Sequence, residues 1–357
     1  MQKQVVIVIN PGSTSTKIAI YNRNGEIKSE TICHTQNELD KFKCTFDQLE
    51  YRYVMINEWL NKFLNGKGFK VVGVVGRGGI VKTLKGGTYR ISESFLKDAR
   101  EFTYGEHASN FGGLLADRMK SEFGLKDSYT VDPVSCGNLL PKAEISGVPG
   151  ITRDGRAHTL NIKMTARKIA RKQNIPFEKT YYVIAHLGGG ISISLVQAGR
   201  LVDVNDALLG MGPFTPNRAG SLPLRGVMKI CYNKSEKEVE SLFTKSSGLK
   251  GYLGTDDVRE VLKMVEDGNE YAALIYEAFI YQIAKEIGAY FVASKCKAQA
   301  IIITGGIAYS KKVCNDLREY VGSLTEFHVY PGENEMEALA EGIFRVIDGE
   351  EKAQEYD

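Results

Sequence analysis

The sequence has 357 residues, with 46 Lys and Arg against 43 Asp and Glu, a length that predicts two domains. Near-balanced charge excludes a dedicated nucleic-acid binder, and 43% hydrophobic residues allow a full core without disulfides or metals. The apolar run 5–9 is too short for a signal peptide, and no stretch reaches the ~18 apolar residues of a membrane span, so we expect a cytoplasmic protein without a membrane partner.

The first thirty residues predict strands and tight turns. A strand over 5–9 leads into a polar turn over 10–17, a second strand follows over 18–21, and a third runs toward residue 32. The Asn24-Gly25 pair between the last two strands is a strong hairpin signal.

The same pattern returns in the second half of the chain. A strand over 181–185 leads into the glycine turn 186–190, and strands follow over 191–196 and 201–204, separated by Ala198-Gly199. The apolar runs 71–75 and 300–303 form another matching pair, since each is soon followed by a double glycine. We therefore predict that one structural unit occurs twice.

Helical periodicity separates these strands. The predicted helices cover 47–65, 106–122, 161–174, a helix opened by the capping box at Ser235, 256–266, 269–295, 309–321 and 335–348. Strands alternating with helices predict an α/β protein of two related domains, 1–155 and 156–334, with mixed sheets and a cleft between them. We expect the C-terminal helix, 335–357, to pack back on the first domain.

The turn from Asn10 to Lys17 resembles a phosphate-binding loop without matching the Walker pattern. A Walker loop opens a helix, whereas a strand follows here. A hairpin turn can still bind phosphate through backbone N–H groups, hydroxyls and a lysine. Either glycine turn alone could be an ordinary tight turn, but their equivalent places in a repeat favour two phosphate-binding loops.

Seven motifs together resemble the butyrate kinases of the acetokinase family, which belongs with sugar kinases, heat-shock chaperones and actin. The resemblance extends in the same order from residue 5 to about residue 345, and it implies two duplicated actin-like (ribonuclease H-like) domains. The motifs are residues 10–17, 76–79, 106–110, 131–135, 156–161, 186–190 and 217–220.

The reaction implied is phosphorylation of a short-chain carboxylate by ATP, reversible with ADP. An aliphatic acid is already ionised at pH 7, so the difficulty is the repulsion between two anions, roughly 4 kcal/mol for unit charges ~4 Å apart at an effective dielectric of 20. Such a site needs cations and hydrogen-bond donors more than it needs a base. The sequence offers Arg77, His107, His158 and Arg218, each of which taken alone could be an ordinary surface or core residue.

The resemblance implies a role for each of these residues. Arg77 and Arg218 would bind the carboxylate and the transferring phosphoryl group, and His158 would donate a hydrogen bond in the transition state, supported by His107. Asp132 and Glu335 match acids that organise Mg²⁺, although Glu337 lies close enough in sequence to be the alternative to Glu335.

The resemblance also implies a nucleotide site. Phosphates would lie against the first turn and the second, and the adenosine against a third glycine segment after the 300–303 strand. The residues concerned are Asn10, Ser13, Lys17, His186, Gly188, Gly189, Gly190, Gly305, Gly306 and Ile307.

Two departures from acetate kinases bear on the substrate. Gly76-Arg77-Gly78-Gly79 stands where those enzymes have a VHGG segment, so the role of Arg77 is carried over by function rather than by strict alignment. Ala157 stands where they have a bulky aromatic residue, which leaves room for further methylenes, each worth ~0.8 kcal/mol when buried. A three- to five-carbon acid, butyrate or a branched acid foremost, therefore fits better than acetate.

Two alternatives stay open: an acetate or propionate kinase with the same mechanism, and a non-catalytic ATP-binding regulator of the same superfamily. For either kinase, the resemblance implies a homodimer or a larger assembly of dimers.

Overall fold

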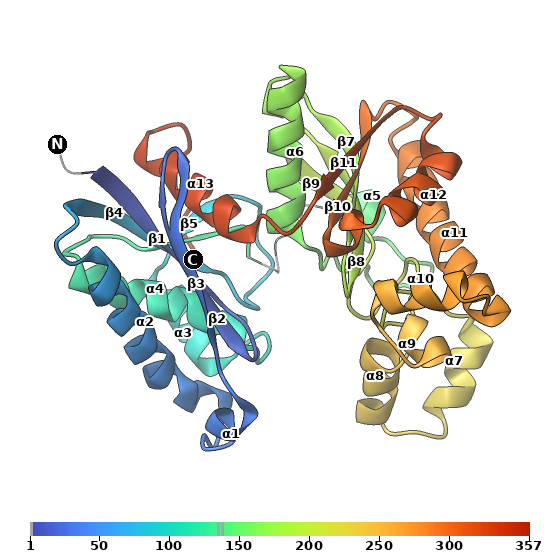
Figure 1. The fold of residues 1–357 in the computed structure, drawn as a ribbon, viewed down its shortest axis with the longest axis horizontal. Helices are drawn as coiled ribbons and strands as arrows, with labels where there is room; N and C mark the ends of the chain where they lie inside the picture. The colour runs from blue at the N-terminus through green and yellow to red at the C-terminus, as the bar shows by residue number, and fades with distance from the viewer. Residues whose placement is uncertain (1–2, 134–135, 137–138) are drawn as a thin grey trace. The chain divides into compact units, whose positions relative to one another are not determined.

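The computed structural model describes residues 3–133, 136 and 139–357 and divides into two compact units. The first unit comprises Met1–Cys136 together with Asn334–Asp357, and the second comprises Gly137–Glu333 (Figure 1). The first boundary thus falls at residue 136, whereas the sequence analysis placed it at 155. The segment that follows belongs with the second unit because Leu140 and Arg156 already bond to its backbone, at Val202 and Ala207.

The first unit is built on a six-stranded mixed sheet in the order β3-β2-β1-β4-β6-β5. Strands β1, β2 and β3 form an antiparallel meander, and β4 and β6 continue the sheet parallel to β1. The strands are β1 (Lys3–Pro11), β2 (Ser15–Asn22), β3 (Gly25–Cys33), β4 (Phe69–Arg77), β5 (Thr88–Arg90) and β6 (Tyr129–Val131).

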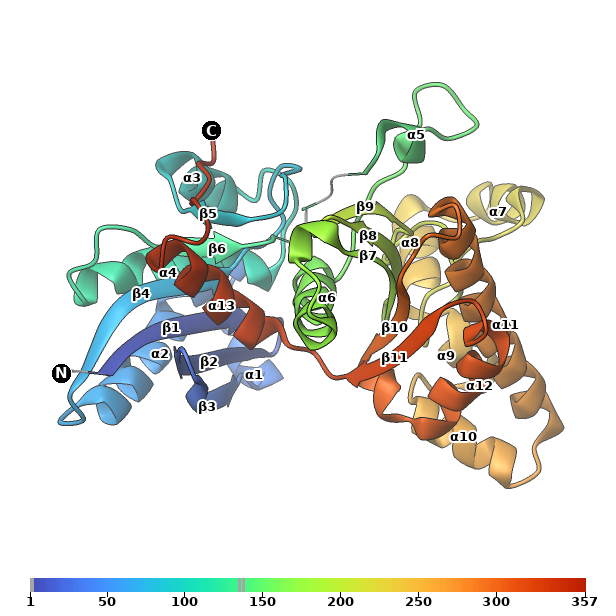
Figure 2. The same ribbon diagram turned by 90° about the horizontal axis from the view of Figure 1, so that it is seen from above.

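Helices cover both faces of this sheet (Figure 2). Alternate residues of β1, among them Ile7 and Ile9, pack with helices α2 (Gln48–Leu64) and α4 (Phe111–Glu122) in one apolar core. Helix α13 (Glu335–Ile347) packs against β1, β4 and β6. Its Ile343 side chain lies against Gly73 of β4. The remaining helical segments are α1 (Gln36–Leu39), α3 (Glu93–Glu101) and the 3₁₀ turns η1 (Thr45–Asp47) and η2 (Ala108–Asn110).

The second unit repeats the arrangement in a five-stranded sheet of order β11-β10-β7-β8-β9. Here β7, β8 and β9 form the meander, and β10 and β11 continue parallel to β7. The strands are β7 (Tyr181–Leu187), β8 (Ile191–Gln197), β9 (Arg200–Val204), β10 (Ala300–Gly305) and β11 (Glu326–Pro331).

Helix α6 (Thr159–Gln173) packs on one face of this sheet, where Ile162 and Ile169 join Ile184 and Ile302 in one core. The long helix α11 (Glu270–Ala293) and α12 (Lys311–Val321) pack on the other face, against residues such as Val183. The unit also contains α5 (Pro141–Glu144), η3 (Phe177–Lys179), α7 (Leu224–Cys231), α8 (Glu236–Lys245), α9 (Gly248–Leu253), α10 (Val258–Glu266) and η4 (Gly306–Tyr309).

The two sheets confirm the predicted duplication. A meander whose first strand pairs with a later parallel strand occurs in both units, and the short strand β5 is the addition in the first. Both predicted hairpins are found. Arg23 and Asn24 join β2 to β3, one residue before the predicted Asn24-Gly25 pair, and Ala198 (φ 51°) and Gly199 (φ 70°) join β8 to β9 as predicted. Positive φ at both Ala198 and Gly199 is the geometry that matches the twist of a hairpin.

In the described part of the chain, no helix combines the length and the apolar character that crossing a membrane requires.

Gly76 allows helix α4 to lie directly on β4, because a Cβ at this position would stand 1.8 Å from the carbonyl oxygen of Gly112. We predict that Gly76→Ala lowers the free energy of unfolding by about 1–3 kcal/mol or more, since backbone must move. Gly73→Ala in the same strand meets only side chains, the end of Ile343 at 2.4 Å and that of Ile347 at 3.3 Å, and should cost less. Urea denaturation of both variants checks the order, and equal losses would contradict it.

Candidate active site

Three parallel strands of the first unit end at one edge of its sheet. Ile9 of β1 pairs with Gly76 of β4, so the next residues, Asn10 and Arg77, stand side by side. Arg77 also pairs with Val131 of β6, and Asp132 is the residue that follows Val131. Arg77 is the last residue of β4, whereas the sequence suggested a glycine loop. Carboxyl ends of parallel strands are where α/β folds place their ligands.

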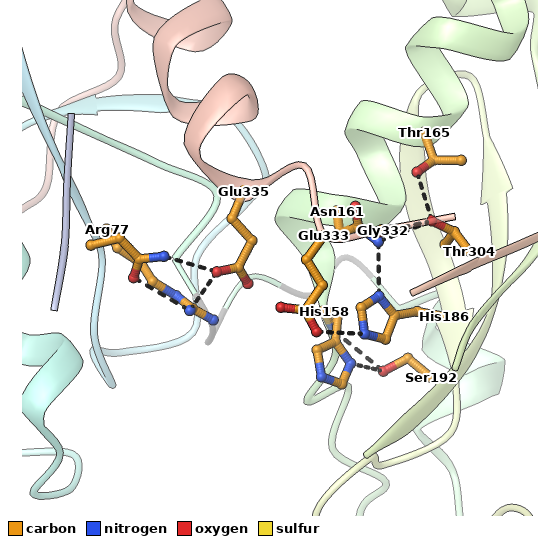
Figure 3. A network of polar contacts seen from close by, with 11 residues as sticks. Arg77, His158, Asn161, Thr165, His186, Ser192, Thr304, Gly332, Glu333 and Glu335 are labelled. Atoms are coloured by element: carbon orange, nitrogen blue, oxygen red, sulfur yellow. Dashed lines mark hydrogen bonds and ion pairs between the residues drawn. The ribbon is translucent and has the colours of Figure 1, made fainter. Parts of the chain in front are cut away.

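Helix α13 adds Glu335 to this edge (Figure 3). Arg77 Nη1 donates to Glu335 Oε2 at 2.7 Å, and Asn10 Nδ2 donates to the same oxygen at 3.0 Å. Glu335 Oε1 has no partner among the described residues, and Arg77 Nε is buried without one. Glu337 instead lies near Tyr21. Burial raises the pKa of Tyr21, and the charges of Glu26 and Glu337 raise it further. Glu335 is thus the acid that faces Asn10 and Arg77.

Asp132 is 5% exposed and adopts a left-handed backbone conformation with φ 39°. Its Oδ1 accepts from the amide of Gly87 at 2.8 Å, and its own amide donates to the Gly87 carbonyl at 3.0 Å. These bonds fix the carboxylate at the sheet edge. Among the described residues no group of three or more His, Cys, Asp or Glu could hold a metal ion. Asp132 and Glu335 still suit Mg²⁺, which needs one or two protein carboxylates besides water and phosphate oxygens.

His107 precedes the turn η2 and is fixed in one tautomer. The Ser109 amide donates to its Nδ1 at 3.1 Å, so the ring proton is on Nε2. Partial desolvation, followed by the cations of Arg77 and Arg52, lowers the pKa of His107 below its ordinary value. His107 is therefore a neutral hydrogen-bond donor at pH 7.

We call residues 11–16, where the chain turns from β1 into β2, the first loop. Of the predicted phosphate-binding residues Ser13 lies in it, and Asn10 and Lys17 flank it on the two strands. Ser13 and Lys17 are exposed, and Lys17 pairs with Asn10 across the hairpin. Sequence patterns did not indicate Arg52, which is fully buried in α2 and donates to the carbonyl oxygens of Gly12 and Ser13, both at 2.9 Å.

In the second unit, His158 lies at the start of α6 and stacks on His186 with ring centroids 3.9 Å apart and planes inclined by 9° (Figure 3). The Ser192 hydroxyl oxygen accepts from the His158 amide at 3.3 Å and lies 2.9 Å from His158 Nδ1. Its proton is then available to Nδ1, which favours the tautomer with Nε2–H. Protonating both stacked rings at once would bring two like charges together and is therefore disfavoured.

Asn161 of α6 fixes the orientation of the His186 ring. Asn161 Nδ2 lies 2.8 Å from His186 Nδ1 and 3.2 Å from the Thr304 hydroxyl, and an amide nitrogen can only donate. The ring proton of His186 therefore sits on Nε2, 3.9 Å from Glu333 Oε1. His186, predicted to bind nucleotide, is 1% exposed and supports the His158 ring.

The glycine turn 188–190, the second loop, is organised around Arg218. A Cβ at Gly190 would stand 2.4 Å from Arg218 Nη1, so glycine here admits a guanidinium, where the sequence analysis expected room for phosphate. The Arg218 guanidinium donates to the carbonyl of Ala207. Thr215 donates to the Gly189 carbonyl at 2.7 Å, and Gly188 is buried while Gly189 is exposed.

The third glycine segment forms a strand end and a 3₁₀ turn. Gly305 ends β10 with φ 90°, and Gly306 and Ile307 begin η4, where the sequence suggested a loop. Gly306 is exposed and Ile307 is half-buried.

Comparison with known proteins gives consistent findings. The model of the acetokinase family matches residues 140–341. A protein named "Probable butyrate kinase 2" from Caldanaerobacter subterraneus subsp. tengcongensis is 41% identical over 98% of this chain and 99% of its own. "Butyrate kinase 2" from Clostridium acetobutylicum is 38% identical over the same shares.

Solved structures share the fold at low sequence identity. Acetate kinase from Entamoeba histolytica has a TM-score of 0.76 at 15% identity, covering 96% of this chain and 100% of that one. A propionate kinase from Francisella tularensis has a TM-score of 0.72 at 18% identity, covering 95% and 98%. These neighbours confirm the predicted actin-like α/β class.

We predict that Arg77→Gln raises the pKa of His107, because it removes a cation that disfavours imidazolium. An NMR titration of the histidine rings measures the shift. Arg118→Gln, which removes an exposed arginine paired with Glu50, is the control and should leave His107 unchanged. A His107 pKa that is unchanged or lower in Arg77→Gln would contradict the assigned electrostatics.

Proposed function

The chain belongs to the acetokinase family, and from that premise we propose that it transfers the γ-phosphoryl group of ATP to butyrate or a branched C4–C5 carboxylate. The family and the relatives named butyrate kinase identify a phosphotransferase whose acceptor is a carboxyl group. The particular acid, the in-line mechanism and the residue roles below are our proposal.

The observation that carries the proposal is the state of Arg218. No carboxylate of the described residues lies within ion-pair distance of its guanidinium, and its Nε is buried without a partner. Burial lowers the pKa of Arg218, although Asp206 opposes this, and the group still remains charged at pH 7. A partly desolvated arginine with no carboxylate within ion-pair distance, beside a glycine turn, suits a planar anion such as carboxylate or phosphate.

The reaction needs no base. A carboxylate oxygen forms a bond to the γ-phosphorus as the bond from phosphorus to the β,γ-bridging oxygen breaks, giving an acyl phosphate and ADP without net proton transfer. The transition state spreads negative charge over three equatorial oxygens. Arg218 and Arg77 would counter this charge, and pre-positioned donors of this kind typically contribute 10²–10³-fold each.

The tautomers support neutral donors for the same charge. His107 presents Nε2–H, and the contact of Ser192 with Nδ1 of His158 favours Nε2–H there too. A neutral histidine donates a hydrogen bond without having to lose its proton as the product forms. We assign His158 to an equatorial oxygen, supported by His107 and positioned by Ser192 and His186.

For the nucleotide, we assign Asn10, Ser13 and Lys17 to phosphate binding in the first unit, and Gly188 and Gly189 in the second. Gly305, Gly306 and Ile307 are assigned to the adenosine. Mg²⁺, when bound, would offset phosphate charge, and Asp132 with the unpartnered Oε1 of Glu335 would hold it.

We also propose that the protein is cytoplasmic and associates with further copies of itself. All six cysteines are free thiols, as suits a reducing compartment. Leu224, Met228 and Tyr232 on and beside α7 are 79%, 56% and 82% exposed, and such apolar groups often mark contacts with another chain. A homodimer or larger assembly would cover them.

We predict acyl-phosphate formation that depends on ATP, Mg²⁺ and acid, detected as hydroxamate after trapping with hydroxylamine. Butyrate and isobutyrate should give higher kcat/KM than acetate, by about fourfold or more per productively buried methylene. Acetate clearly outperforming both would favour the acetate or propionate kinase alternative. ATP hydrolysis without any dependence on acid would favour the non-catalytic regulator.

We predict that Arg218→Ala lowers carboxylate-dependent turnover by roughly 10²–10³-fold while leaving the fold intact. Arg259→Ala, which removes an exposed arginine of α10 paired with Asp257, is the matched control and should keep wild-type rates. Steady-state kinetics with both substrates varied gives the measurement. Retained turnover in Arg218→Ala would count against the site assignment.

A further inference from the structure

Arg52 is a buried arginine that holds the first loop from the interior. It lies in the second turn of α2 and is 0% exposed. Nη1 donates to the carbonyl oxygens of Gly12 at 2.9 Å and Ser15 at 3.3 Å, and Nη2 donates to that of Ser13 at 2.9 Å. One side chain therefore binds three of the six backbone carbonyls of the loop 11–16.

The remaining contacts of Arg52 fix its own position. Nη1 also donates to the Thr16 hydroxyl at 3.0 Å, and Nη2 to the Gln48 side chain at 2.9 Å. The guanidinium lies over the Phe111 ring at 5.7 Å. Thr16 Oγ1 in turn lies 2.9 Å from Nε2 of His34, which is 3% exposed.

No described residue places a carboxylate within ion-pair distance of Arg52. Burial lowers the pKa of Arg52 to about 10, so the group is still charged at pH 7. Its charge reaches its surroundings, because it contributes to lowering the pKa of both His34 and His107. A buried charge is costly unless it is compensated, and here the dipoles of the carbonyl groups compensate the charge of Arg52 in place of an anion.

We propose that Arg52 is a positioning residue that shapes the first loop to receive the nucleotide phosphates. Carbonyl oxygens carry partial negative charge and would repel a phosphate if they faced it. Arg52 draws three of them toward the interior, while Ser13 and Thr14 stay exposed on the other side. Because no carboxylate neutralises Arg52, its positive charge also lies beneath the loop. This inference rests on the proposed use of ATP as phosphoryl donor.

The test compares nucleotide binding by Arg52→Gln and the wild type, measured by isothermal titration calorimetry with ATP, ADP and adenosine. Glutamine keeps one donor and removes the charge and the fork. We expect ATP and ADP affinity to fall about tenfold or more, with adenosine affinity unchanged, because adenosine does not use the loop. Arg118→Gln is the control: Arg118 packs over Tyr53, next to Arg52 on α2, and should bind all three ligands like the wild type.

Unchanged ATP and ADP affinity in Arg52→Gln would overturn the proposal. An equal loss for all three ligands would also overturn it, since that result indicates a purely structural role. If circular dichroism shows that Arg52→Gln does not fold, Arg52→Lys takes its place. Lysine keeps the charge without the fork, so we expect a several-fold loss confined to ATP and ADP, and wild-type affinities would overturn the idea.

Measuring both nucleotide binding and acyl-phosphate formation distinguishes a failure of this inference from a failure of the proposed function. If the wild type binds ATP but forms no acyl phosphate with any acid, the proposed function fails. The difference between ATP and adenosine in Arg52→Gln would then still decide the role of Arg52.

Discussion

Parallel pairing of the first strand of each meander with a later strand is the constraint on which the candidate site depends. The β1–β4 and β7–β10 ladders set which residues stand side by side where the strands end. In the first unit this brings Asn10 next to Arg77, and in the second it brings His186 next to Thr304. Because these ladders are backbone hydrogen bonds in the middle of a sheet, the side chains at their ends inherit the rigidity of the core.

In both units an arginine from outside the hairpin lies against the turn of that hairpin. Arg52 holds carbonyls of the first loop, and Arg218 fills the space that Gly190 leaves in the second. Neither guanidinium has a carboxylate partner within ion-pair distance among the described residues. These two guanidinium groups thus supply local positive charge in a chain whose net charge is only +3.

Local sequence signals predicted most of the fold. Apolar runs marked the central strands, Asn24-Gly25 and Ala198-Gly199 marked two hairpins, and matching glycine turns revealed the duplication. Contacts between distant residues were not predictable: Ser192 meets His158 across 34 residues and Arg52 meets Ser13 across 39. Strand β5 was not predicted for a similar reason, since its Arg90 amide donates to the carbonyl of Gln354 near the C-terminus. Nothing in the periodicity near residue 52 distinguishes a buried arginine from an exposed one.

The return of α13 to the first unit has a consequence for biosynthesis. A ribosome makes residues 3–133 long before Glu335, so the nascent sheet emerges with the face next to Gly73 uncovered and Arg77 without its acid. At typical rates of ~5–20 residues per second, the interval lasts about 10 to 40 s. During that time the face of the sheet that α13 covers in the finished chain is exposed to solvent, and a prematurely terminated chain would lack this cover. The last helix thereby makes completion of the N-terminal half depend on completion of the whole chain.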